Sequence, residues 1–500
     1  MADPFEPLRA LPRTRLPDLF AADPGRVERL TLELEGLRFD WSKTHLDEGA
    51  LGALTKLADA RDLAGARARL FAGEIVNPSE HRAALHPAER GSGSERAVAN
   101  AEALRARTRA LVDAIEADVL GPIRHVLHVG IGGSALGPAL LLDALGRDSD
   151  RYDVKVVSNV DGAALAEATR DMDPQVTLLC IASKTFTTSE TMLNARSALA
   201  WMEEGGVEDP YGQVVAMTAN PDAAVAWGVD ETRVLPFAPE VGGRYSLWSS
   251  IGFPAALALG WDAWEALLAG AEAMDLHFRA ESWVRNAPVL AAFGDLLYAQ
   301  ARGAQTRAVF AYDERLRLLP SYLQQLEMES NGKSVAADGS LLDHPTAPIT
   351  WGGTGTDAQH AVFQLLHQGT RLVPVEFVAV AEPGHNLDEE HHRQLLINCF
   401  AQGAALMAGQ ESADGARAYP GDRPSATILA DQLDPRTLGA LLAFYEHRTY
   451  ANAVLLGINP FDQFGVELGK EIAKGLSGEG QASFDPSTEA LIARVFDTDQ

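Results

Sequence analysis

Cysteine is nearly absent from this sequence, and long apolar runs are missing from it. The 500 residues contain two cysteines, Cys180 in VTLLCIAS and Cys399 in LLINCFAQ. Both lie in apolar segments, where a reduced, buried thiol is usual, so we expect neither a disulfide framework nor a CxxC metal site. No stretch reaches the ~18 apolar residues of a membrane span, and prolines and charges interrupt MADPFEPLRALPRTRLPDLF, where a signal peptide needs an apolar core. We therefore expect a cytoplasmic protein.

Positive charge is also scarce. Lys and Arg number 42 against 69 Asp and Glu, which gives a formal net charge of −27. Nucleic acids and anionic membranes bind basic surfaces, so we expect neither as a partner. A small anion is still compatible with this charge if cationic groups gather in one pocket. At roughly 150 residues per domain, the length predicts two or three globular domains.

Strand and helix patterns alternate along the chain after a helical preface. Residues 1–120 have apolar residues at three- and four-residue spacings, which predicts helices. Residues 121–285 and 286–433 each contain apolar strands joined by helices, which indicates parallel sheets covered on both faces. We predict an α/β fold with two doubly wound domains in tandem, followed by a helical segment over residues 434–500.

A glycine-rich loop follows the first strand of the first α/β domain. The sequence GIGGSA, from Gly130 to Ala135, fits the GxGxxG/A fingerprint, in which glycines let backbone N–H groups approach a phosphate. In NAD-binding proteins the next strand ends in Asp or Glu, whereas Ser158 and Asn159 stand there in this chain. A glycine turn that only lets a helix pack close to its strand is the alternative.

Hydroxyl groups gather in a second loop, between the strand QVTLLCIAS and the helix ETMLNARSALAWM. This loop contains Ser183, Lys184, Thr185, Thr187, Thr188 and Ser189. Hydroxyls, an ammonium group and the free N–H groups of a helix start suit the oxygens of a phosphate monoester. A helix cap with solvated threonines is the alternative. Because both loops end neighbouring strands of one sheet, we predict a single anion pocket at its carboxyl edge.

Several side chains in the second half of the chain could move protons or bind the molecule that reacts. The sets are Gln325 with Glu329, His360 with Gln364 and His367, and Gln463 with Glu467 and Lys470. Spacings of three or four place each set on one helix face. A solvated face, a structural histidine or a helix-stabilising Glu–Lys pair is the ordinary alternative. Arg244 follows two glycines in VGGRYSLWSS, a placement that lets a guanidinium enter a cleft or form an ordinary turn.

A histidine-rich segment favours a metal site at first sight. It contains His385, Glu389, Glu390, His391 and His392. It lacks the HExxH spacing that places two imidazoles on one helix face with a base between them. We interpret it as a solvated helix start.

Six segments, in order, resemble the glucose-6-phosphate isomerase family. They are GIGGSALGP (130–138), SKTFTTSET (183–191), VGGRYSLWSSIG (241–252), MESNGK (328–333), QHAVFQLLHQGT (359–370) and FDQFGVELGK (461–470). The similarity extends from about residue 125 to about residue 474, and the first 100 residues or so match poorly. Ala135, Leu326 and Phe464 stand where relatives often carry Asp, Gly and Trp, but every expected chemical group is present.

The resemblance implies two sugar-isomerase (SIS-type) domains and an enzyme that interconverts glucose 6-phosphate and fructose 6-phosphate in glycolysis and gluconeogenesis, without cofactor or metal. It implies that Glu329 moves a proton between C2 and C1 through an enediolate whose charge Arg244 offsets. It implies that His360 and Lys470 open the sugar ring, and that the protein is a homodimer with active sites shared between subunits. The substrate-binding residues it implies are Gly133, Ser134, Ser183, Lys184, Thr185, Thr188, Gln325 and Gln463.

Three other functions stay open on the sequence alone. An NAD-dependent oxidoreductase is favoured by GIGGSA and opposed by the missing ribose carboxylate. A non-catalytic sugar-phosphate sensor would keep the two loops but would not need Glu329, His360 and Lys470, which are all present. A sister isomerase that acts on mannose 6-phosphate differs only at C2 of its substrate.

Overall fold

The computed structural model describes residues 3–476 and 484–496. The chain divides into two compact units, Met1–Pro460 and Phe461–Gln500. All described strands lie in the first unit, in two sheets, and the second unit contributes α18 (Glu467–Leu476) and α19 (Pro486–Phe496). Among the described residues, no helix combines the length and the apolar character that crossing a membrane requires.

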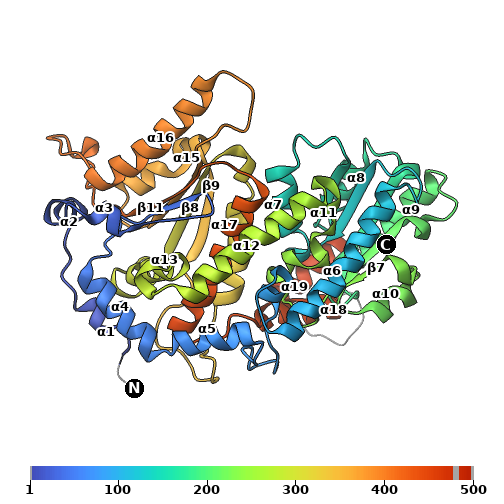
Figure 1. The fold of residues 1–500 in the computed structure, drawn as a ribbon, viewed down its shortest axis with the longest axis horizontal. Helices are drawn as coiled ribbons and strands as arrows, with labels where there is room; N and C mark the ends of the chain where they lie inside the picture. The colour runs from blue at the N-terminus through green and yellow to red at the C-terminus, as the bar shows by residue number, and fades with distance from the viewer. Residues whose placement is uncertain (1–2, 477–483, 497–500) are drawn as a thin grey trace. The chain divides into compact units, whose positions relative to one another are not determined.

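The first sheet has five strands, all parallel, in the order β4-β3-β5-β6-β7. Its strands are β3 (His125–Gly130), β4 (Asp153–Val157), β5 (Thr177–Ala182), β6 (Val214–Thr218) and β7 (Val234–Pro236). The connecting helices are α7 (Leu136–Leu145), α8 (Gly162–Thr169), α9 (Ser189–Glu204) and α10 (Pro221–Trp227), as Figure 1 shows. Every residue of β5 is buried, because helices cover both faces of the sheet.

The second sheet has six strands in the order β1-β2-β11-β10-β8-β9. Its parallel strands are β8 (Thr306–Tyr312), β9 (Ile349–Thr354), β10 (Val375–Val380) and β11 (Ser425–Ala430). Alternate strand residues such as Phe310 and Phe377 pack against α15 (Gly355–Gln368) and α16 (Glu389–Ala408). Strand residues that point to the other face of the sheet, such as Glu376, contact α17 (Pro435–Leu456). The predicted α/β fold with parallel sheets is confirmed.

The N-terminal segment contains strands as well as the predicted helices. Its helices are α1 (Glu6–Arg9), α2 (Leu16–Ala22), α3 (Arg26–Arg29), α4 (Glu48–Ala60), α5 (Leu63–Ala72) and α6 (Glu95–Glu116). Between them, β1 (Thr31–Leu34) and β2 (Leu37–Asp40) form a hairpin that pairs with β11. Glu35 and Gly36 at its tip have φ of 51° and 71°, as a two-residue hairpin turn requires. The segment thereby extends the second sheet.

Two long helices, α12 (Trp261–Ala280) and α17, pack against each other at unusually close range (Figure 1). A Cβ atom added at Gly270 would lie 1.8 Å from the Arg436 carbonyl oxygen, and one at Gly439 would lie 1.9 Å from that of Leu267. The contact therefore requires glycine at both positions. Shorter helices precede the site segments: α11 (Phe253–Leu259), α13 (Ala287–Leu296) and α14 (Leu319–Leu323). Cys180 and Cys399 are buried and free, as predicted.

The buried carboxyl group of Glu89 should make stability depend on pH. Glu89 is 5% exposed, and burial raises the pKa of its carboxyl group from 4.5 to about 7. Between these values the unfolded chain releases the proton first, so stability is lost as the pH rises through this window. Glu89→Gln removes this titration. We therefore expect wild type to lose about 2–3 kcal/mol more of its free energy of unfolding than the variant does between pH 5 and pH 8. Urea denaturation at both pH values measures this, and an unchanged difference would contradict it.

Candidate active site

Both predicted anion loops follow neighbouring strands of the first sheet. β3 pairs with β5 in parallel, and β4 lies on the other side of β3. The chain therefore turns in opposite directions after these two strands, which creates a switch point at the carboxyl edge between β3 and β5. The glycine-rich loop directly follows β3, and the hydroxyl loop directly follows β5. The predicted neighbourhood of the two strands is confirmed.

Close backbone contacts explain the glycines of the first loop. Gly132 has a φ of 57°, and a Cβ atom there would lie 2.8 Å from Gln325 Nε2. A Cβ atom at Gly133 would lie 2.1 Å from the carbonyl oxygen of Gly243, next to Arg244. The loop therefore lies against two other predicted site segments, those of Arg244 and Gln325.

His128 supports this loop from the middle of β3, a role that the sequence analysis missed. Its Nε2 lies 2.7 Å from the carbonyl oxygen of Ser134. Burial lowers the pKa of His128 to about 4, so the ring is neutral at pH 7. Because a carbonyl oxygen only accepts, Nε2 carries the proton and donates it. No sequence signal distinguishes this histidine from an ordinary buried strand residue.

The hydroxyl loop is held by its own side chains. Ser183 Oγ lies 3.2 Å from Thr188 Oγ1 and accepts a hydrogen bond from the Phe186 backbone N–H at 3.1 Å. Thr188 is the N-cap of α9, and Thr185 is exposed. Phe186 has a φ of 57°, an uncommon conformation for an aromatic residue that is typical of functional loops. The chain thus presents hydroxyls and a helix N-terminus at one point.

Lys184 supplies a positive charge to the same loop. Its ammonium group donates a hydrogen bond to the Val241 carbonyl oxygen at 3.1 Å, in the segment that carries Arg244. Burial lowers the pKa of Lys184, and the nearby Arg82 guanidinium lowers it further. The half-buried ammonium group therefore connects the hydroxyl loop to the arginine segment.

Arg244 and Glu329 face each other, although 84 positions separate them in the printed sequence. Arg244 Nη1 lies 3.6 Å from Glu329 Oε2, and the two side chains are 2% and 18% exposed. Arg244 Nε donates to Ser330 Oγ at 2.6 Å, and Nη2 donates to the Pro460 carbonyl oxygen. Glu329 Oε2 is buried and has no hydrogen-bond partner among the described residues. A carboxylate oxygen with this environment can accept a proton from a bound molecule.

Glu329 ends a π-helical turn, η11 (Gln324–Glu329), that continues α14. Such turns are rare and are frequent at functional sites. Gln325 and Glu329 share this turn, and Gln325 is the residue that approaches Gly132. The sequence predicts a helix here, and the structure adds that its last turn is wider than an α-helix.

His360 lies on α15 and is exposed to solvent in the single chain. Among the hydrogen bonds and ion pairs of the described residues, none joins His360 to Arg244 or Glu329. Its neighbours on the helix bind within the fold: His367 Nε2 lies 2.8 Å from Gln402 Oε1, and Gln364 donates to Gln368 at 2.8 Å. His360 is therefore the one histidine of the predicted helix face that points outward, with His367 structural.

Gln463 and Lys470 belong to the second compact unit. Gln463 precedes the short helix η13 (Phe464–Val466), and Lys470 lies on α18 with Glu467. The predicted helix face is thus divided between two elements, and Glu467 and Lys470 share one of them.

The second sheet has a corresponding switch point, between β8 and β10, with a different chemistry. A cleft of about 600 Å³ lies there, lined by residues that include Asp148, Asp313, Glu314, His385, His391 and Asp434. Arg315 also lines it, but its Nη2 donates to Asp313 at 2.7 Å. Within residues 3–476 and 484–496, no group of three or more His, Cys, Asp or Glu residues has a metal-binding arrangement. Arg147 lines it too, and its Nη2 donates to both carboxylate oxygens of Asp143 at 3.0 Å, so both arginines of the lining are bonded to carboxylates.

Known proteins match this chain over nearly its whole length. The sequence profile of the family described as phosphoglucose isomerase matches residues 40–492. The glucose-6-phosphate isomerase of Rhizorhabdus wittichii is 69% identical over 488 residues, which cover 98% of each chain. That of Zymomonas mobilis is 61% identical over 479 residues, which cover 96% of this chain and 94% of the relative.

A solved structure extends the similarity to three dimensions. The crystal structure of a glucose-6-phosphate isomerase from Chlamydia trachomatis matches with a TM-score of 0.88 at 32% identity. The match covers 97% of this chain and 96% of that chain. Because the profile, the sequence identities and the fold agree over nearly the whole length, the chain belongs to the phosphoglucose isomerase family.

Proposed function

We propose that this protein interconverts D-glucose 6-phosphate and D-fructose 6-phosphate, in glycolysis and gluconeogenesis in the cytoplasm. The observation that carries the proposal is the buried Glu329 Oε2, which faces the Arg244 guanidinium at 3.6 Å and has no hydrogen-bond partner among the described residues. Isomerisation needs a base and a cation near the developing negative charge, and this pair provides both.

The proton transfer follows from the chemistry of the two groups. Glu329 removes the proton from C2 of the open-chain aldose, and the electrons move toward the C1 oxygen to give an enediolate. Arg244 stabilises that negative charge at close range. The proton of the C2 hydroxyl moves to the C1 oxygen, and Glu329, now protonated, returns its own proton to C1, which gives the ketose with its carbonyl at C2. The residues present perform each step without a redox cofactor or metal.

Ring opening needs groups that protonate the ring oxygen and accept the hydroxyl proton. We propose His360 and Lys470 for this step, and Gln325 and Gln463 for contacts with the sugar. The position of the Gln325 side chain next to Gly132 in the glycine-rich loop supports the proposed role of Gln325. The step is separate from proton transfer at C2, so substitutions can distinguish the two.

The phosphate group would bind between the two loops of the first sheet. The proposed contacts are Gly133, Ser134, Ser183, Lys184, Thr185 and Thr188. Support comes from the switch point between β3 and β5 and from the ammonium and hydroxyl groups there. Both arginines of the corresponding cleft in the second sheet are bonded to carboxylates, which favours one phosphate site per chain.

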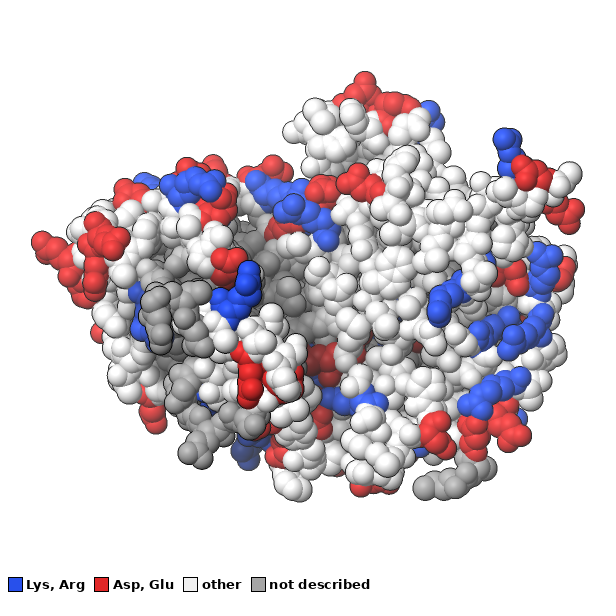
Figure 2. Space-filling view, turned by 180° about the vertical axis from the view of Figure 1, so that it is seen from behind, with Lys and Arg blue, Asp and Glu red and all other residues white. Residues whose placement is uncertain are grey.

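A homodimer with shared active sites would explain the exposed position of His360. Helices α15 and α16 also expose large apolar side chains, which are typical of an interface. They are Leu365 at 45%, Ile397 at 43% and Phe400 at 47% exposure. A second copy on this surface would bring its own His360 to the partner's site. On the side of the molecule that Figure 2 shows, Lys and Arg lie beside Asp and Glu rather than in one basic patch, which favours neither nucleic acid nor membrane as partner.

A coupled assay tests the proposed activity directly. The purified protein is mixed with fructose 6-phosphate in a metal-chelating buffer, and glucose 6-phosphate is measured after removal of the protein. We expect rapid formation of glucose 6-phosphate and much slower formation of mannose 6-phosphate. If mannose 6-phosphate is the main product, the sister isomerase is the correct function. If neither aldose forms, the proposed activity is wrong.

The phosphate loop gives a quantitative prediction. Ser183→Ala combined with Thr185→Ala removes two hydroxyl donors, and each hydrogen bond to a charged group is worth roughly 1.5–3 kcal/mol. We expect KM for the sugar phosphate to rise by roughly 100-fold or more, with a smaller change in kcat. Ser189→Ala, at the first residue of α9 and bonded to Glu190, is the matched control. Unchanged KM and unchanged inhibition by inorganic phosphate in the double variant would rule out this phosphate site.

A further inference from the structure

The π-helical turn that carries Glu329 contributes one residue to a set of five charged side chains from five elements. We name this set the buried ionic cluster. Its members are Asp295 on α13, Arg307 on β8, Glu327 on η11, Glu376 on β10 and Arg448 on α17. Glu327 is the member that belongs to the turn, two positions before Glu329. Because residues two apart on a helix do not face each other, the turn directs these two carboxylates to different environments.

Glu327 is held from both sides. The Arg307 guanidinium contacts both carboxylate oxygens of Glu327, and Thr350 Oγ1 on β9 donates to Glu327 Oε2 at 2.6 Å. Arg307 also donates to Glu376 Oε1 at 3.1 Å. The turn is thereby attached to two neighbouring strands of the second sheet, β8 and β9.

Arg448 completes the buried ionic cluster. It donates to Glu376 Oε2 and to Asp295 Oδ1, both at 2.6 Å. Burial alone would raise the pKa of Glu376, but Arg448 and Arg307 outweigh burial and hold it below the ordinary value. The same two guanidinium groups hold the pKa of Asp295 below its ordinary value as well. Three carboxyl groups thus face two guanidinium groups in a region where each side chain is at most 11% exposed.

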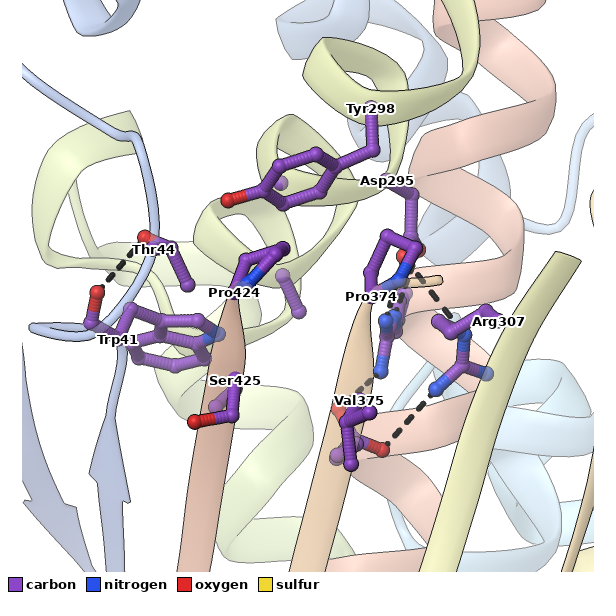
Figure 3. A pocket seen from close by; sticks show the side chains of 14 residues that line it. Trp41, Thr44, Asp295, Tyr298, Arg307, Pro374, Val375, Pro424 and Ser425 are labelled. Carbon is purple, nitrogen blue, oxygen red and sulfur yellow. Dashed lines mark hydrogen bonds and ion pairs between the residues drawn. The ribbon is translucent and has the colours of Figure 1, made fainter. Parts of the chain in front are cut away.

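There is little room for these groups to rearrange. Figure 3 shows a small cavity beside the cluster, with Arg307 and Asp295 joined by a dashed line on one side and Trp41 and Ser425 on the other. The volume of the cavity is about 30 Å³, which is room for one water molecule. Arg307 lines this cavity, and its ion pairs with Asp295, Glu327 and Glu376 hold the guanidinium at the cluster.

We infer that Glu327 and Arg307 are positioning residues for Glu329, an inference that rests on the proposed isomerase function. A π-helical turn is an uncommon conformation that tertiary contacts must maintain. The ion pair between Glu327 and Arg307 fixes the turn, and the turn places Glu329 Oε2 3.6 Å from Arg244 Nη1. Since proton transfer depends steeply on geometry, a loosened turn slows the chemical step more than it weakens binding.

Glu327→Gln tests the inference because it keeps the shape and an oxygen for Thr350 but removes the charge that Arg307 binds. We expect kcat to fall by roughly 10–100-fold with KM within two-fold of wild type. The kinetic isotope effect of C2-deuterated substrate should increase, because proton transfer becomes more rate-limiting. Cyclic and open-chain substrates should be slowed equally. Glu89→Gln, at an equally buried glutamate outside the cluster, is the matched control and should leave kcat unchanged.

Other results of these experiments would also show whether Glu327 positions Glu329. A folded Glu327→Gln variant with kcat within two-fold of wild type, or with a loss found only in KM, would overturn the inference. If Glu327→Gln does not fold, Thr350→Val removes a single hydrogen bond and should lower kcat several-fold by the same pattern. If wild-type protein does not isomerise at all, the proposed function fails. The inference is then judged by hydrogen exchange of residues 324–331, which should quicken in Glu327→Gln but not in Glu89→Gln.

Discussion

Glu329→Gln is expected to lower kcat by a factor on the order of 10²–10⁴ while the sugar phosphate still binds. The amide keeps the size and shape of the carboxylate but cannot accept the C2 proton. Arg244 keeps its bonds to Ser330 and Pro460, so the pocket should retain its form. Steady-state kinetics gives kcat, and calorimetric titration with substrate gives the affinity. Glu314→Gln, at an exposed glutamate, is the control.

Two results would contradict this assignment of the base. Near-normal turnover of Glu329→Gln would mean that another group removes the proton. A complete loss of substrate binding would mean that Glu329 binds the sugar instead of moving its proton.

His360→Ala should slow the cyclic substrate far more than an open-chain analogue that needs no ring opening. The acid–base contribution at stake is on the order of 10²–10⁴ in kcat for the cyclic form. Glu329→Gln should slow both forms, because the C2 proton moves in either case. His367→Ala, on the same helix but bonded to Gln402, is the matched control. Equal slowing of both forms by His360→Ala would rule out a ring-opening role.

The same variants test whether the site is shared between subunits. If His360 serves the partner's site, a dimer of one His360→Ala chain and one Glu329→Gln chain contains one intact site. Equal mixing of the two inactive variants, with exchange confirmed by mass spectrometry, should restore about a quarter of the wild-type activity. No activity after full exchange would mean that each chain builds its site alone.

The sequence predicts several strands from their apolar runs. The runs in β3, β5, β8 and β10 are buried along nearly their whole length, and the pattern identifies them. β9 was missed because ITWGGT contains two glycines, which ordinarily argue against a strand. The structure shows the reason for one of them: a Cβ atom at Gly352 would lie 1.8 Å from the Val309 carbonyl oxygen on β8. Such a requirement arises from the neighbouring strand and leaves no local signal.

The sequence predicts the individual segments of the site but not how these segments contact one another. Spacing places Gln325 with Glu329, and the two loops follow recognisable strands. The contact of Arg244 with Glu329 depends on how two distant segments fold together, so no spacing rule gives it. The sequence also does not predict the support from His128 and Glu327, since nothing in the local sequence distinguishes them from ordinary strand and helix residues. The roles of the predicted site residues remain predictions from family membership and chemistry.

The fate of a label at C2 tests the central claim, that Glu329 carries the C2 proton to C1 through an enediolate. Glucose 6-phosphate deuterated at C2 is converted, and the ketose and recovered aldose are analysed by mass spectrometry and NMR. We predict that deuterium is partly transferred to C1 and partly lost to water, because a carboxyl group exchanges its proton with solvent while the enediolate exists. We predict that Glu329→Gln abolishes both the transfer and the loss. Complete retention of the label during turnover, or exchange that survives Glu329→Gln, would contradict the mechanism.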